Sequence, residues 1–192
     1  MNKQGLPYKD YRKLVFEKGY KLYKKLGEIN IVGYRFPDSR PNYFDDILSV
    51  YYSIEDEDPI QFDFSITTYP GIPWLLNPMN KKGTAILKEG QYVDSYALGD
   101  FKGYTALKQI KPVTVYRDYN KDLIFNKDPD TLDTGYFGIH IHRGNIYSKV
   151  VGLTSAGCQV FKDRTEYKSF IDICESVKNT HNNRFTYTLV EL

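Results

Sequence analysis

The chain has 192 residues, enough to bury a substantial core and typical of one domain. Hydrophobic residues make up 41% and charged residues 26%, as in an ordinary globular protein. The formal net charge of +2 is too small to favour nucleic acid or an anionic membrane as a partner, and the absence of any run of eighteen apolar residues predicts no membrane-spanning helix.

The first half of the chain predicts one helix followed by strands. A rough apolar stripe at helical spacing, broken at Gly19 and ended by Gly27, predicts a helix over residues 7–26. The segments "INIVGYRF" and "DDILSVYYSI" are rich in β-branched and aromatic residues, and "IQFDFSITT" alternates apolar and polar residues, so all three predict strands. The three prolines and two glycines of "YPGIPWLLNPMNKKG" predict an irregular loop.

The second half predicts further strands and one amphipathic helix. "GTAILKEGQYV" predicts a short strand and a turn, "PVTVYRD" and "DLIF" predict strands around a turn, and "NKDPDTLDTG" predicts a loop. "YFGIHIH" and "RFTYTLVEL" predict strands, and "TEYKSFIDICESV" predicts a helix capped by Asp163 or Thr165. About eight strands with a helix near each end indicate a mainly β chain, either a sandwich or a strongly bent mixed sheet.

The densest cluster of reactive side chains lies in "GIHIHRGNIYSKVVGLTSAGCQVF", residues 138–161, which holds two of the three histidines and one of the two cysteines. If "YFGIHIH" is a strand, His140 and His142 point to one face and the intervening isoleucines to the other. Gly157 permits a tight turn just before Cys158. Free backbone N–H groups at such a turn suit an oxyanion hole, and a nearby imidazole would activate the thiol as a nucleophile.

Structural explanations compete with a catalytic one. Cys174 lies on the apolar face of the predicted last helix and is expected in the core. Cys158 follows small residues and hydroxyls, which fits a core position less well. A metal site would need third and fourth ligands, and the remaining histidine, His181, reads as a loop residue. We therefore expect no metal and no cofactor.

The segments "IHRG" and "VGLTSAGCQVF" resemble the active-site signature of the L,D-transpeptidase family, an "IHG"-like strand end, a gap, and Ser/Thr-x-Gly-Cys. "TTYPG" is similar to the family's Thr-Pro-x-Gly stretch in a different order, and the likeness extends over residues 45–192. It implies a sandwich-like β catalytic domain over 45–192, with residues 1–30 as a helical extension of the same single domain. Members of the family form an acyl-enzyme on peptidoglycan stem peptides and pass the acyl group to an amine or to water.

The resemblance also implies roles for individual residues. Cys158 is the expected nucleophile, and two histidines compete as its base. Fifteen residues lie between His142 and Cys158, the spacing of short-gap members, whereas long-gap members would use His140. The backbone of the turn, at Ala156 and Gly157, would stabilise the oxyanion. Neighbouring residues would contact the substrate: Arg143, Gly144, Ser155 and Gln159.

Two positions depart from the family pattern. Ala156 stands where the family often has His, and Val160 stands where it usually has Arg or Asn, so Gln159 is expected to supply the missing polar contact. The variant "SAGCQVF" is similar to phage and prophage relatives, which implies degradation of the wall rather than cross-linking.

The start of the chain has no apolar core of a signal peptide. With the phage-like motif, this leads us to expect a protein made in the bacterial cytoplasm and carried in a virion, in association with other virion proteins, or released to the cell wall. Two alternatives stay open: a non-catalytic virion structural or wall-binding protein that keeps the fold, and a metal-dependent hydrolase that uses His140, His142 and a carboxylate.

Overall fold

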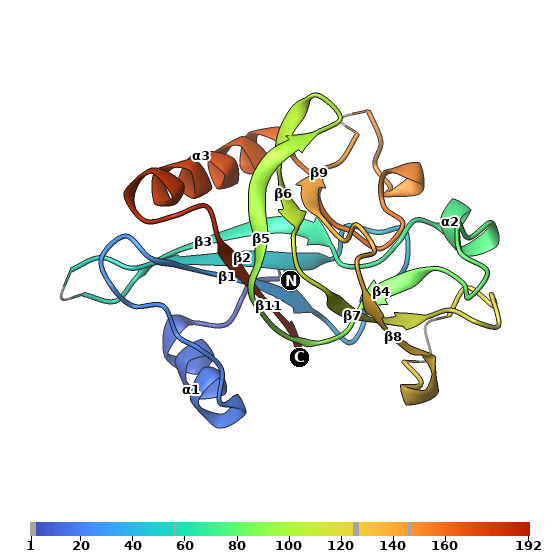
Figure 1. The fold of residues 1–192 in the computed structure, drawn as a ribbon, viewed down its shortest axis with the longest axis horizontal. Helices are drawn as coiled ribbons and strands as arrows, with labels where there is room; N and C mark the ends of the chain where they lie inside the picture. Colours follow the sequence, from blue (N-terminus) through green and yellow to red (C-terminus); the bar gives the residue numbers. More distant parts are fainter. Residues whose placement is uncertain (1–2, 56, 125–126, 146) are drawn as a thin grey trace.

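In a computed structural model, which describes residues 3–55, 57–124, 127–145 and 147–192, the chain is mainly β. Eight strands close into a barrel in the order β1-β11-β5-β6-β9-β10-β3-β2, and a separate sheet has the order β4-β7-β8 (Figure 1). The barrel strands are β1 (Ile29–Arg35), β2 (Asp46–Tyr52), β3 (Ile60–Thr67), β5 (Gly90–Phe101), β6 (Tyr104–Gln109), β9 (Ile141–Arg143), β10 (Gln159–Phe161) and β11 (Phe185–Glu191). The small sheet consists of β4 (Ala85–Leu87), β7 (Val113–Arg117) and β8 (Leu132–Gly135), and the α-helices are α1 (Tyr8–Lys18), α2 (Ile72–Leu76) and α3 (Arg164–Thr180).

The barrel is a mixed sheet. Strands β1 and β11 pair in parallel, as do β9 and β10, and the other neighbours pair antiparallel. The mainly β prediction is confirmed, and the strands form a closed barrel with a small sheet beside it (Figure 1). Likeness to the sandwich-like L,D-transpeptidase domain stays a prediction. The barrel includes β1, which precedes residue 45 in the chain.

Helix α3 packs its apolar face against the barrel, as its periodicity predicts. The side chain of Asp163 accepts hydrogen bonds from the backbone N–H groups of Thr165 and Glu166, which identifies the cap. Phe170 and Cys174 are fully buried in the main core, where the Phe170 ring centroid lies 4.9 Å from that of Phe161. Cys174 is therefore a core residue, as expected, and neither cysteine forms a disulfide.

The N-terminal helix is shorter than predicted. Helix α1 ends at Lys18 because Gly19 adopts a left-handed conformation, φ 65°, and closes the last turn. The chain then runs along the barrel, where Lys21 N–H donates to Gln91 Oε1 at 2.7 Å and Tyr23 N–H donates to Asn30 Oδ1 at 3.1 Å. The prediction of helix over 19–26 is thus wrong, since polar contacts with the barrel replace helical bonds.

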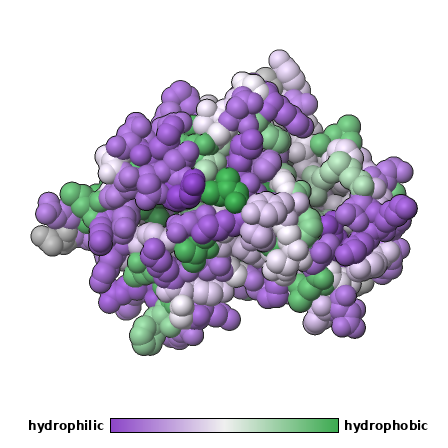
Figure 2. Space-filling view, in the orientation of Figure 1, coloured by the Kyte–Doolittle hydropathy of each residue, from purple (hydrophilic) through white to green (hydrophobic). Residues whose placement is uncertain are grey.

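Figure 2 shows hydrophobic residues only in small separate areas on the viewed face.

Three loop or strand predictions need correction. The segment predicted as loop between β3 and β4 contains α2, which begins beside Pro73, a residue tolerated in a first helical turn. The loop predicted over 126–135 ends in β8, which pairs with β7, because that edge was free to accept a strand. No strand forms over 122–124, and the last residue of the predicted "DLIF" strand, Phe125, lies outside the described residues.

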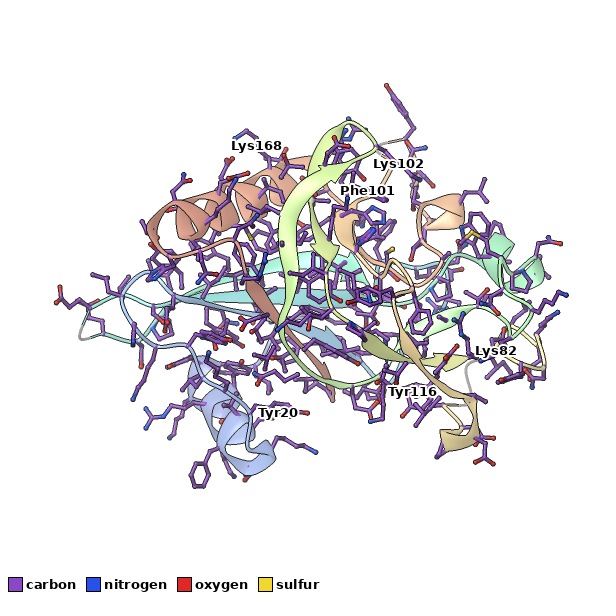
Figure 3. All side chains as sticks on the ribbon, in the orientation of Figure 1. Tyr20, Lys82, Phe101, Lys102, Tyr116 and Lys168 are labelled. Atoms are coloured by element: carbon purple, nitrogen blue, oxygen red, sulfur yellow. The ribbon has the colours of Figure 1, made fainter. Side chains whose placement is uncertain are left out.

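The sequence patterns missed most of the β5–β6 hairpin. Its turn residues Lys102 and Gly103 have φ values of 54° and 81°, the positive values that two-residue hairpin turns require. Phe101 and Lys102 lie at the tip, near β9 (Figures 1 and 3). This tip covers the two histidines described below.

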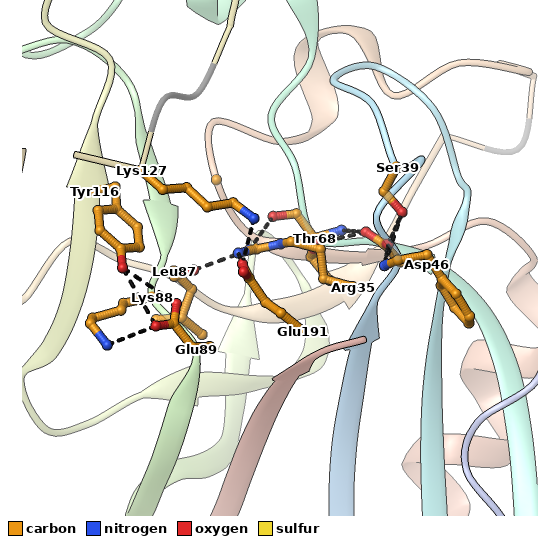
Figure 4. A network of polar contacts seen from close by, with 12 residues as sticks. Arg35, Ser39, Asp46, Thr68, Leu87, Lys88, Glu89, Tyr116, Lys127 and Glu191 are labelled. Carbon is orange, nitrogen blue, oxygen red and sulfur yellow. Dashed lines mark hydrogen bonds and ion pairs between the residues drawn. The ribbon is translucent and has the colours of Figure 1, made fainter. Parts of the chain in front are cut away.

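A buried arginine ties the small sheet to the barrel (Figure 4). The guanidinium of Arg35, in β1, donates to Thr68 Oγ1 at 2.8 Å, to the Leu87 carbonyl of β4 at 3.0 Å and to Glu191 of β11 at 2.8 Å. Arg35 is only 1% exposed, so these charge-assisted bonds form away from water, where a lost partner is costly. The network therefore holds β4 at a defined place beside the barrel.

Candidate active site

The two histidines of β9 and its approach share one face. Ile139 and Ile141 are buried in the main core, whereas the rings of His140 and His142 both pack on the Phe101 ring, with centroid separations of 5.1 and 5.0 Å. This alternation is the one predicted from the strand pattern, but the strand is shorter than "YFGIHIH" predicts, because β9 begins at Ile141 and residues 136–140 lie in no strand. The aromatic cover comes from the hairpin tip, a segment distant in sequence.

The turn before Cys158 accepts only glycine at position 157. Gly157 has φ 122°, and a Cβ there would lie 2.3 Å from the Ala85 carbonyl oxygen. Ser155 closes the turn, because its hydroxyl accepts the Gly157 N–H at 3.1 Å and donates to the Cys158 carbonyl at 3.0 Å. Strand β10 starts at the next residue, so the turn places Cys158 beside the residues that lead into β9.

The sulfur of Cys158 is held by backbone groups. Sγ donates to the Gly138 carbonyl at 3.2 Å and accepts the His140 N–H at 3.4 Å. Among the described residues, no imidazole nitrogen forms a hydrogen bond with Sγ. Burial raises the pKa of Cys158 to about 11, opposed by the His140 N–H and by Lys102. The resting group is therefore a neutral thiol.

His142 is held as the tautomer that a general base requires. Its Nδ1 lies 2.9 Å from the Arg143 carbonyl, which can only accept, so Nδ1 carries the proton and Nε2 keeps its lone pair. Tyr104 Oη lies 3.4 Å from the same Nδ1. Burial lowers the pKa of His142 to about 4, against the effect of the Arg143 carbonyl. Near neutral pH the ring is therefore uncharged and Nε2 is unprotonated, but the lowered pKa makes the ring a weak base.

His140 is held as the opposite tautomer. Its Nδ1 accepts the backbone N–H of Gln109 at 3.0 Å, so the proton of the neutral ring resides on Nε2. Burial, together with the positive charge of Lys108, lowers the pKa of His140 to about 4. The free nitrogen of His140 is thus a hydrogen-bond donor, whereas that of His142 is an acceptor.

Register and tautomer favour different histidines. In the parallel pairing of β9 with β10, Gln159 lies opposite Ile141 and Val160 opposite His142. Extending that register places Cys158 beside His140, with His142 two positions further along the strand. The sulfur is thus nearer the backbone of His140, but the base-competent nitrogen belongs to His142.

The turn leaves backbone donors free. The Gly157 N–H is taken by Ser155. In the described part of the chain, the N–H groups of Ala156 and Cys158 donate to no backbone or side-chain acceptor. Of the two residues predicted to supply oxyanion donors, Ala156 therefore has an available N–H and Gly157 does not, and Cys158 adds another.

The predicted substrate-contacting residues take several positions. Gln159 is wholly buried and accepts the Tyr187 hydroxyl at 2.9 Å, so it faces the barrel interior. Ser155 is also buried and shapes the turn. Arg143 stacks on the Tyr104 ring at 4.1 Å, and the Gly144 N–H donates to the Phe161 carbonyl at 2.8 Å.

Sequence patterns did not point to three residues that organise the site, all from the β5–β6 hairpin. Phe101 covers both imidazoles, Tyr104 approaches His142, and Gln109 sets the His140 tautomer. The Gln109 side chain also accepts the N–H groups of Phe137 and Ile139, at 3.2 and 3.0 Å. The Lys102–Gly103 turn is the one sequence signal of this hairpin, and it does not predict contact with the histidines.

None of the described residues forms a group of three or more His, Cys, Asp and Glu side chains able to hold a metal ion. His181 is exposed just after α3, at the end of the helix and apart from β9. No described helix has the length and apolar content needed to cross a bilayer.

Comparisons with family models, with curated proteins and with solved structures give no match. The likeness to L,D-transpeptidases accordingly depends on the sequence motif alone.

Proposed function

We propose that the chain is a cysteine acyl transferase or peptidase of the L,D-transpeptidase kind, with Cys158 as nucleophile and His142 as general base. The observation that supports this most is the arrangement of opposite tautomers. The thiol is carried by the turn before β10, which pairs with the strand of His142; His142 is a neutral imidazole that can accept a proton, and His140 is one that can donate a hydrogen bond.

The chemistry begins when the thiol exchanges its bond with the Gly138 carbonyl for one with His142 Nε2. The thiol proton passes to Nε2 as sulfur attacks a carbonyl carbon, and the N–H groups of Ala156 and Cys158, which have no acceptor among the described residues, would donate to the developing oxyanion. The C–N bond then breaks, the leaving amine takes the proton from His142, and a thioester remains. Water attacks the thioester, gives a proton to His142 and releases the acid, and the proton returns to sulfur.

The substrate class in this proposal is the peptidoglycan stem peptide, which follows from the motif resemblance. The phage-like "SAGCQVF" variant favours water over an amine as acceptor, because Val160 offers no polar group to hold an acceptor in place. Delivery in a virion, or release to the wall at lysis, is part of the same proposal.

Purified sacculi test the proposal. Wild type should lower turbidity and release shortened stem peptides detectable by mass spectrometry, whereas Cys158→Ala should not, and Cys174→Ala, which changes the core cysteine, should retain activity. Chelator should leave activity unchanged, since the chemistry uses a thiol nucleophile. Accumulation of new cross-linked dimers would make the protein a transpeptidase proper, and full activity of Cys158→Ala would eliminate the proposal.

One observation favours a second candidate, a non-catalytic wall-binding or virion structural protein. The thiol is hydrogen-bonded to backbone groups and has a raised pKa, as expected for a structural cysteine. A wall-binding protein would sediment with sacculi without releasing peptides, and Cys158→Ala would sediment equally well.

A further inference from the structure

A cavity of about 250 Å³ lies between the small sheet and the Cys158 turn. Its lining includes Thr84 and Ala85 at the start of β4, Phe137 and Ile139, and Ala156 of the turn, two residues before Cys158. Ile139 lies between Gly138 and His140, the two residues whose backbone holds the sulfur. The cavity therefore borders the candidate active site on both of its chain segments.

Arg117, at the end of β7, is the single charged side chain among the described residues that line this cavity. The residue is only 7% exposed. Its Nε donates to Asp133 at 3.2 Å, its Nη1 donates to the Gly83 carbonyl at 3.2 Å, and its guanidinium lies 4.7 Å from the Phe137 ring centroid. Guanidinium carries five N–H donors, and no described residue accepts a hydrogen bond from Nη2. Arg117 is thus a buried cation that lines an open cavity and has guanidinium N–H groups without an acceptor among the described residues.

Asp133 is the carboxylate that pairs with Arg117 among the described residues. The same carboxylate oxygen lies 3.6 Å from Nζ of Lys82, whose side chain is 55% exposed. Asp118 and Asp128 line a neighbouring cavity that Arg117 also lines, and the Asp118 carboxylate accepts the Lys121 N–H. Figure 3 shows Lys82 on the same side of the molecule as the small sheet.

We propose that this cavity binds the free carboxylate at the end of a peptide substrate, with Arg117 as the binding residue. A carboxylate would accept two parallel hydrogen bonds from the guanidinium edge, a charge-assisted and planar arrangement. The side chain next to the carboxylate would pack on Phe137 and Ile139. The volume is below the roughly 300–1,000 Å³ of a typical ligand pocket, so the cavity suits the end of a chain and not a whole substrate.

The inference rests on the proposed function for the identity of the substrate, and it specifies where the substrate is cut. With the terminal carboxylate held by Arg117 in the cavity that Ala156 also lines, the carbonyl presented to Cys158 would belong to a peptide bond close to that terminus. The protein would then remove terminal residues from stem peptides in preference to cutting inside them.

Binding to the Cys158→Ala variant tests the inference without turnover. A purified muropeptide with a free terminal carboxylate, and the same muropeptide with that carboxylate converted to an amide, are titrated calorimetrically. We expect the carboxylate form to bind at least about tenfold more tightly, as for hydrogen bonds to a charged group. Adding Arg117→Gln should abolish that preference. Adding Arg40→Gln should preserve it, although Arg40 likewise stacks on an aromatic ring, Tyr43, and pairs with an aspartate, Asp45.

Equal affinity for the two muropeptides would overturn the inference, as would a folded Arg117→Gln variant that keeps the preference. If Arg117→Gln unfolds, Arg117→Lys decides, because it keeps the charge but loses the planar fork and should reduce the preference. The comparison of carboxylate with amide needs no change at Arg117. Carboxylate-selective binding without release of peptides from sacculi would refute only the proposed chemistry, and cleavage without selectivity would refute only the binding site.

Discussion

The alkylation rate of Cys158 as a function of pH tests whether the resting site holds a neutral thiol. Burial raises the pKa of this thiol from 9.0 to about 11. Only the thiolate reacts with iodoacetamide, and a rise of two pKa units lowers the thiolate fraction at pH 8 by about 100-fold. The alternative, a thiolate paired with a protonated imidazole, would require a histidine pKa near or above neutrality, whereas burial lowers the pKa of both histidines to about 4.

The assay follows iodoacetamide labelling from about pH 7 to about pH 10, with peptide mass spectrometry to separate Cys158 from Cys174. In the native protein, the logarithm of the Cys158 rate should rise by about one per pH unit with no plateau. The same cysteine in urea serves as the control and should level off near the ordinary thiol pKa, about 8.5–9. A plateau below pH 9 in the native protein would refute the neutral-thiol resting state and indicate a preformed ion pair.

Three further predictions concern the histidines and the turn. Nitrogen-15 NMR should find the ring proton of His142 on Nδ1 and that of His140 on Nε2, and His142→Ala should lose far more activity than His140→Ala; the reverse pattern would assign the base to His140. Gly157→Ala should lower the free energy of unfolding in urea by about 2–5 kcal/mol, from backbone strain plus the close Ala85 carbonyl, whereas Gly19→Ala, with positive φ but open space, should cost about 1 kcal/mol. The pKa of His142 falls from 6.5 to about 4 on folding, so its contribution to the free energy of unfolding is full above pH 6.5 and is lost as the pH falls towards 4, by up to about 3 kcal/mol. In His142→Asn the free energy of unfolding should therefore fall less steeply between pH 6.5 and 4. Equal pH dependence of the free energy of unfolding in the two proteins would contradict the assignment.

Local patterns predicted the elements whose apolar residues recur at a helical or strand period, wherever their partners lie in the sequence. Helix α3 has a continuous apolar stripe and an Asp163 cap, and β1, β2, β3, β7 and β11 are apolar runs or apolar–polar alternations between turn residues. The pattern failed where tertiary contacts override local preference. Gly19 ends α1 because the following residues bond to the barrel, and β8 forms because β7 offers a free edge.

The sequence by itself determined the candidate chemistry. Alternation along "GIHIH" placed His140 and His142 on one face, and Gly157 before Cys158 indicated a tight turn, because these depend only on strand period and on backbone sterics. The roles of the two histidines were open, since both have the same side chain and lie within one strand pleat.

Only the tertiary structure separated those roles, because a tautomer depends on which group bonds to each ring nitrogen. The Gln109 N–H comes from β6, 31 residues before His140, and no local pattern predicts that approach. The buried position of Gln159 and the cavity beside Ala156 likewise depend on which strands close the barrel and where the small sheet docks. Such contacts are set by the packing of distant segments, which a single sequence does not specify.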